Sequence, residues 1–181
     1  MKKKLLTLIL CAFMLTLSFS LFGCSTSLNK EVSFEGLTLK VPSNWVEEDS
    51  SLDTSSYSDI NIGTVNFLET SNASTGNWMS VSWSNYNDGK TPDELIKEEE
   101  QSAKEINGKN WHQNKLDEYD LESAHVVLYE SSYEMDSRDG TNTFNTQYAF
   151  IDSIGMSYEI KVYGDAIDIK DIMDTASITL A

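Results

Sequence analysis

The first 24 residues decide how much of the chain remains to form a domain. Residues 2–4 are three consecutive lysines, and residues 5–22 form an uncharged apolar run with a few threonines and serines. A basic stretch followed by an apolar run is typical of an export signal. A run of this length is also long enough to cross a bilayer as an uncleaved helix, which is the alternative interpretation.

The residues that follow the run favour the export signal. Leu21-Phe22-Gly23-Cys24 resembles the lipobox of bacterial lipoproteins, although Phe22 is bulkier than the residue usually found there. The resemblance implies that residues 1–23 are a signal peptide removed directly before Cys24, and that the Cys24 thiol carries a thioether-linked diacylglycerol with fatty acyl chains such as palmitate. Two acyl chains give stable attachment, so we expect a domain anchored at the outer face of a cell membrane.

The expected anchor is followed by a short tether. Residues 24–31 hold the lipidated cysteine and seven further residues before the first predicted strand. At about 3.3–3.6 Å per residue, these seven residues reach roughly 25 Å at most. We therefore expect the domain to work close to the membrane, with a Gram-positive cell surface as the favoured location.

Charge and cysteine content exclude several classes of function. Removal of residues 1–23 leaves ten basic residues against 29 acidic ones, a formal charge of −19. Phosphate contacts need clustered Lys and Arg, so we expect no binding of nucleic acid. The acidic surface points to a basic partner or a cation, with solubility as the alternative. Cys11 lies in the expected signal and Cys24 is expected to be lipidated, which leaves no cysteine for a disulfide or for thiolate chemistry.

The mature chain is predicted to form a single domain over residues 32–181, because it shows no repeat, low-complexity tract or change of composition. Val32–Phe34 and Leu37–Val41 flank Glu35-Gly36, which predicts a tight hairpin, and Pro42 ends the second strand.

Further strands and two helices are predicted along the chain. The strands are expected at Ile60–Glu69, at residues 79–83, where apolar residues alternate with serines, and at Leu121–Met135, Thr143–Ile151 and Met156–Tyr163. Thr91-Pro92-Asp93-Glu94 has the form of a capping box and predicts a helix that ends at Asn107-Gly108. Asp165 is expected to cap a final helix with an apolar stripe from Ile169 to Ala176. The predicted fold class is α+β, an antiparallel sheet with helices packed on it.

The order of these elements, together with Val41-Pro42-Ser43-Asn44-Trp45, resembles the PsbP-like fold. That family includes an extrinsic photosystem II protein, a Ran-binding nuclear import factor and many small bacterial lipoproteins. The resemblance covers residues 31–181 as an element order and implies a PsbP-like α/β/α sandwich in which Trp45 is buried behind the first hairpin. It carries over no catalytic residue and implies a domain that binds other proteins.

The chain contains no nucleophile elbow, zinc-protease motif or phosphate-binding glycine loop, so we expect neither an enzyme nor a cofactor. His112 and His125, with Asp120 or Glu122, form the alternative, a metal or acid/base cluster. The simpler interpretation places His125 on a strand face and His112 at a surface bend, with no bound metal. Asp136–Gly140 lacks the ligand spacing of a calcium loop and predicts a hairpin turn.

Four tryptophans, eight tyrosines and seven phenylalanines raise the possibility of an aromatic binding surface. Trp78 is expected to point toward the serine face of its strand, and Trp111 lies between the polar residues Asn110 and His112. These two tryptophans are the candidate binding contacts, and the alternative is that they cover sheet edges. The sequence therefore predicts a non-catalytic, membrane-anchored module that binds another envelope protein. A small-ligand or cation-binding receptor is the second hypothesis, and a hydrolase is the third.

Overall fold

The computed structural model describes residues 27–52, 61–69, 76–86, 89–121 and 123–179, without the side chains of residues 49–52. The predicted signal peptide, Cys24 and Glu122 lie outside the described residues. Within the described part of the chain, no helix is both long enough and apolar enough to span a membrane.

Strands make up most of the described chain. They are β1 (Leu28–Phe34), β2 (Leu37–Pro42), β3 (Trp45–Leu52), β4 (Ile62–Glu69), β5 (Trp78–Ser84), β6 (Lys109–Leu121), β7 (Ala124–Ser137), β8 (Gly140–Ser153), β9 (Met156–Tyr163) and β10 (Ser177–Ile178). The helices are α2 (Pro92–Glu105) and α3 (Ile169–Met173). A seven-stranded antiparallel sheet has the order β3-β4-β5-β9-β8-β7-β6, and a three-stranded sheet has the order β1-β2-β10.

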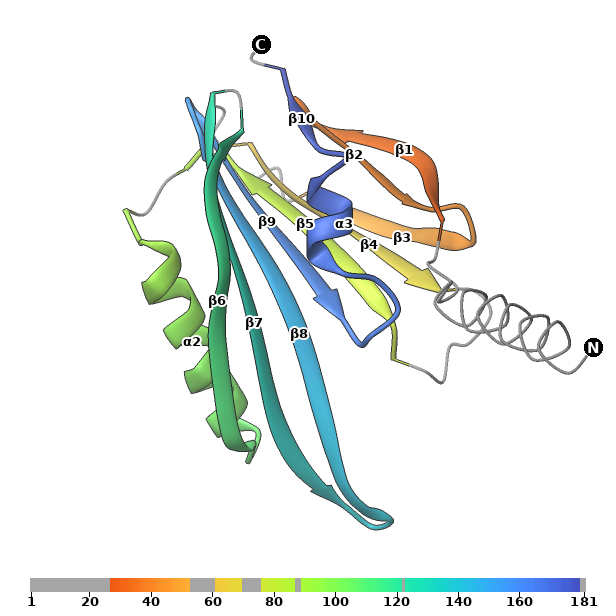
Figure 1. Ribbon diagram of the computed structural model, residues 1–181, viewed down its shortest axis with the longest axis vertical. Coiled ribbons are helices and arrows are strands. Elements are labelled where there is room, and N and C mark those ends of the chain that lie inside the picture. Colours follow the sequence, from red (N-terminus) through yellow and green to blue (C-terminus); the bar gives the residue numbers. More distant parts are fainter. Residues whose placement is uncertain (1–26, 53–60, 70–75, 87–88, 122, 180–181) are drawn as a thin grey trace, which may run out of the picture.

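The predicted α+β class, with its PsbP-like α/β/α sandwich, is wrong. The fold is β-rich, with 63% strand and 14% helix in two antiparallel sheets. The reason lies in what covers the large sheet. One of its faces packs against the small sheet and the five-residue helix α3, so strands supply most of the opposing layer (Figure 1).

The main core lies between the two sheets. Every second residue of a strand points into this core, because alternate side chains of a strand lie on the same face. Its fully buried members include Leu37, Leu39 and Val41 from β2, Met79 and Val81 from β5, Ile160 and Val162 from β9, and Ile169 and Ile172 from α3.

The other face of the large sheet carries α2, which lies beside β6, β7 and β8 (Figure 1). Ile96 of α2 is buried in a second apolar cluster whose other buried members, Val127, Tyr129, Tyr148 and Phe150, come from β7 and β8. Two polar contacts add to this packing. Asp93 accepts a hydrogen bond from the Tyr129 hydroxyl, and Glu99 accepts one from the Lys161 ammonium at 2.7 Å.

Several local predictions are confirmed. The first hairpin turns at Glu35-Gly36, both of which have positive φ angles, 43° and 98°. Trp45 is buried, with 1% of its surface exposed. Thr91 and Glu94 form the complete capping box of α2.

Other local predictions need correction. The last helix is shorter than expected, because Asp168 is its N-cap and α3 ends at Met173. Asp165 instead accepts a hydrogen bond from the Asn145 side chain. Strands β3 and β6 were not predicted, since their sequences are rich in charged residues and lack a regular apolar alternation.

The β7–β8 hairpin projects beyond the rest of the large sheet (Figure 1). Pairing of β7 with β8 continues to Ser137 and Gly140, whereas β9 ends where Tyr163 pairs with Thr146. We call residues 132–145 the hairpin extension. Its sequence-predicted turn at Asp136–Gly140 is confirmed, because Ser137 donates a hydrogen bond to the Gly140 carbonyl at 2.9 Å.

Candidate functional site

The structure brings both candidate tryptophans into stacks of aromatic rings. The Trp78 ring stacks on Tyr163 of β9, with a centroid distance of 3.7 Å and an interplanar angle of 9°. The Trp111 ring stacks on Tyr133 of β7 at 6.3 Å and 20°. Tyr133 in turn stacks on Phe144 of β8 at 5.2 Å and 16°. The five rings therefore come from five different strands, and we call them the aromatic surface.

Strand register explains why these rings meet. Trp78 pairs directly with Tyr163, and Tyr133 pairs directly with Phe144. Side chains of directly paired residues lie about 4.5–5.5 Å apart at Cβ, which is within stacking distance for aromatic rings. Tyr133 and Phe144 belong to the hairpin extension. The aromatic surface thus spans the point where β9 ends and the extension begins.

A pocket of about 580 Å³ lies between the two stacks. Trp78, Tyr163, Tyr133 and Phe144 contribute to its lining, together with polar residues that include Asn77, Asn145, Thr146 and Asp165. Phe144 remains 42% exposed, and the other four rings are half-buried. Burial raises the pKa of both Tyr133 and Tyr163, so their hydroxyls stay neutral at physiological pH. The pocket offers apolar ring surface together with neutral hydrogen-bonding groups.

Three carboxylates near the end of the large sheet have neutral partners, and Asp165 is the one that lines the pocket. Glu134 accepts a hydrogen bond from Asn110 at 2.7 Å, Asp165 accepts one from Asn145 at 3.1 Å, and Glu130 accepts one from Asn114 at 3.2 Å. An amide leaves the charge of its carboxylate partner uncompensated. None of these three carboxylates forms an ion pair with a described residue. Alternation along β7 puts Glu130 and Glu134 on the face of the sheet opposite Tyr133, so Asp165 supplies the negative charge beside the rings.

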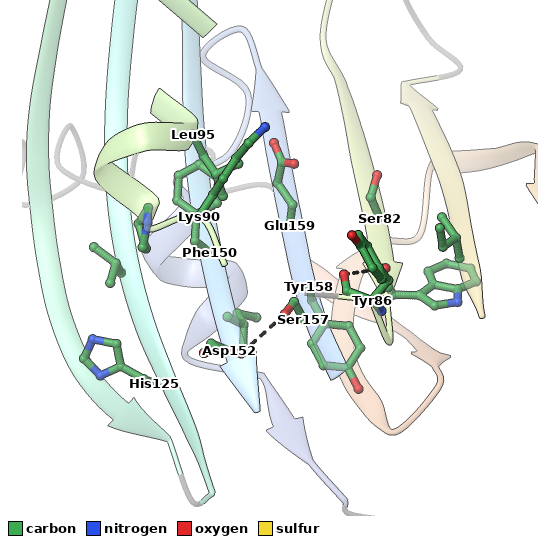
Figure 2. Close-up of a pocket in the computed structure, with 16 residues that line it drawn as sticks. Ser82, Tyr86, Lys90, Leu95, His125, Phe150, Asp152, Ser157, Tyr158 and Glu159 are labelled. Atoms are coloured by element: carbon green, nitrogen blue, oxygen red, sulfur yellow. Dashed lines mark hydrogen bonds between the residues drawn. The ribbon is translucent and has the colours of Figure 1, made fainter. Parts of the chain in front are cut away.

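A second pocket, which we call the helix pocket, lies at the N-terminal end of α2 (Figure 2). Its volume is about 290 Å³. Its apolar part includes Leu95 of α2 with Val127 and Phe150 of the large sheet, and its polar part includes serines of β5 and β9. Trp83, Tyr86 and Tyr158 also line it.

The two histidines of the alternative metal or acid/base cluster lie at different places in the structure. The His125 ring nitrogens lie 3.0 Å from an Asp120 oxygen and 3.1 Å from a Glu118 oxygen, so the charged imidazolium can donate to both carboxylates. The hydrogen bond to Asp120 is the main cause that raises the pKa of His125. His112 lines a different pocket, and within the described residues no group of three side chains has the arrangement of a metal site.

Ser157 and His125 both line the helix pocket, but they have different partners. Ser157 donates a hydrogen bond to Asp152 at 3.3 Å, and the described hydrogen bonds of His125 go to Asp120 and Glu118. In a Ser-His-Asp triad, the serine nucleophile has a histidine within hydrogen-bonding distance as its base. Among the described residues, these contacts do not link Ser157 to a histidine.

Comparison of the chain with known protein families and with curated proteins found no match. The roles of the site residues are therefore inferred from geometry and charge. Sequence reasoning missed Tyr133, Phe144 and Tyr163, which complete the aromatic surface. Their signal was weak, because each lies in a strand where its importance depends on a partner in another strand.

Proposed function

We propose that this chain is a lipoprotein held at the outer face of a cell membrane by diacylglycerol on Cys24, and that its domain is a non-catalytic module that binds another envelope protein. The basic stretch, the apolar run and the lipobox-like Leu21–Cys24 support the anchor. The short tether supports a partner that lies close to the membrane.

The observation that carries the binding role is the aromatic surface on a projecting hairpin. Aromatic side chains are enriched in the centres of protein interfaces, because they bury a large area and have few rotatable bonds. A single exposed aromatic residue is common on a protein surface, but a contiguous apolar group beside a pocket marks an interaction site. Phe144 is the most exposed of the five rings and is the expected centre of the contact.

Charge supports the type of partner. Asp165 lines the pocket beside the rings and is held by a neutral amide, and the whole chain has a formal charge of −16. Opposite charge accelerates association and disfavours acidic partners. The partner would therefore present an apolar or aromatic segment with Lys or Arg side chains around it.

Site-directed photo-crosslinking in intact membranes tests this proposal. A benzophenone amino acid at position 144 should crosslink to a partner protein. The same amino acid at position 154 is the matched control, because Ile154 is 78% exposed and lies in the turn at the other end of β8. The crosslink at position 144 should decrease in the presence of excess unlabelled chain, which distinguishes a specific partner from an abundant neighbour.

Affinity measurements with the identified partner complete the test. Phe144→Ser should weaken binding about tenfold, as is usual for a central aromatic contact, whereas Ile154→Ser should leave it unchanged. Added salt should also weaken binding, because it screens the carboxylates. Equal crosslinking at positions 144 and 154, or unchanged affinity of Phe144→Ser, would contradict the proposal.

A further inference from the structure

The helix pocket is a second candidate site, and it is separate from the aromatic surface that carries the proposed function. It lies at the N-terminal end of α2, whereas Tyr133 of the aromatic surface contacts the backbone near the C-terminal end of that helix, at Gly108. The two pockets share no lining residue. An occupant of the helix pocket would therefore be separate from a partner on the aromatic surface.

Strand register divides the floor of the helix pocket into two rows. The row nearer the apolar cluster consists of Ser82, Glu159, Phe150 and Val127, and the outer row consists of Ser84, Ser157, Asp152 and His125. Figure 2 shows Phe150 beside Leu95 of α2, and the Ser157 hydroxyl directed toward Asp152. One part of the pocket is thus apolar, and the adjoining part carries hydroxyls and carboxylates.

The charged groups of the pocket differ in how they are partnered. Glu159 forms an ion pair with Lys161 at 2.8 Å, and Lys90 forms one with Glu98 at 2.7 Å. His125 is held by Asp120 and Glu118.

Asp152 has a different environment from these groups. Its contact with another side chain is the Ser157 hydroxyl at 3.3 Å, and no basic side chain among the described residues lies within ion-pair distance of it. Asp152 is exposed and therefore accessible to a ligand.

We propose that the helix pocket binds a small organic amine, with its apolar body on Leu95, Val127 and Phe150 and its ammonium group at Asp152. The volume of about 290 Å³ lies just below the usual range for drug-sized ligands, about 300–1,000 Å³, which favours a compact molecule. The formal charge of −16 raises the local concentration of cations over anions.

Tyr86 supports the same chemistry, because it lines the pocket and the face of an aromatic ring attracts cations. The rings of Trp83 and Tyr158, which also line it, are buried in the main core. Tyr86 is 60% exposed, so its ring is accessible from solvent. An anionic ligand would instead face Asp152 and Glu159, and a purely apolar ligand would leave Asp152 without a partner of opposite charge.

Equilibrium dialysis with radiolabelled 2-phenylethylamine tests this inference. The full chain is used in detergent, with protein-free micelles as the blank. Saturable binding to the chain is expected. The neutral analogue 2-phenylethanol should compete more weakly than unlabelled amine, and the anionic analogue 3-phenylpropanoate should compete least, because the three share an apolar body and differ in charge.

Substitutions in the helix pocket and at a control position test where the amine binds. Asp152→Asn should weaken amine binding about two- to fivefold, the range expected for one exposed ion pair, and should leave binding of the alcohol unchanged. Asp139→Asn makes the same change of net charge in the β7–β8 turn and should have no effect. Tyr86→Ala should also weaken amine binding.

Three results would each overturn the inference: no saturable binding at millimolar amine, equal competition by the acid and the amine, or equal effects of Asp152→Asn and Asp139→Asn. These results would not bear on the protein partner, because Asp152 does not belong to the aromatic surface. Conversely, amine binding should survive Phe144→Ser, so the two proposals fail separately.

Discussion

Trp45 combines deep burial with an unpartnered donor, and this combination leads to a specific prediction for two substitutions. Its side chain is 1% exposed within the main core, and its indole N–H has no hydrogen-bond partner among the residues that the structure describes. Truncation of a buried tryptophan to alanine costs about 3–5 kcal/mol. For a protein of this size, that cost lowers the melting temperature by about 6–20 °C. Trp45→Ala should therefore be strongly destabilising.

Trp45→Phe should be much milder. The smaller ring loses some buried area and leaves a small cavity, at a cost of about 1–2 kcal/mol. It also removes an unpaired buried N–H, whose desolvation costs about 1–3 kcal/mol in the parent. These two effects oppose each other, so the stability of Trp45→Phe should lie within about 1 kcal/mol of the parent.

Urea unfolding of the full chain in detergent, followed by circular dichroism, measures both variants. The unfolding midpoint should fall far for Trp45→Ala and little for Trp45→Phe. Parent-like stability of Trp45→Ala would refute the burial of this side chain. Equal destabilisation by both substitutions would instead show that the indole N–H has a partner in solution.

Three further predictions follow from other parts of the chain. Cys24→Ala should prevent lipid labelling and leave the precursor uncleaved, and a lipid-labelled mature protein from this variant would refute the anchor. Thr91→Ala removes the N-cap of α2 and should cost about 1 kcal/mol by urea unfolding, whereas Thr91→Ser should restore most of it. Since the hydrogen bond to Asp120 raises the pKa of His125 above 6.5, its stabilising effect should be complete below pH 6.5 and should disappear as the pH rises through the raised pKa. The difference in urea midpoint between the parent and His125→Gln should shrink over that rise, and a pH-independent difference would contradict this assignment.

Structural features that depend on a few neighbouring residues could be predicted from the sequence. The Glu35-Gly36 turn, the capping box at Thr91 and Glu94, and the burial of Trp45 were predicted correctly. Each depends on backbone conformation, on a hydrogen bond between near neighbours or on one very apolar side chain.

The fold class and the strands β3 and β6 could not be predicted in this way. Strand β6 has a mostly exposed sequence, and the pairing with β7 along one edge defines it as a strand. The small sheet forms because β10, near the end of the described chain, pairs with β2 near its start. Such long-range pairing leaves no periodic signal in a single segment. The prediction from sequence therefore overestimated the contribution of helices to the fold.

The candidate site shows the same division. Trp78 and Trp111 could be identified from the residues beside them as tryptophans in polar surroundings. Their stacking with Tyr163, Tyr133 and Phe144 from three other strands became visible in the folded chain. The physical reason is that stacking across a sheet depends on register, and register is decided by the burial of whole strand faces rather than by the residues that stack.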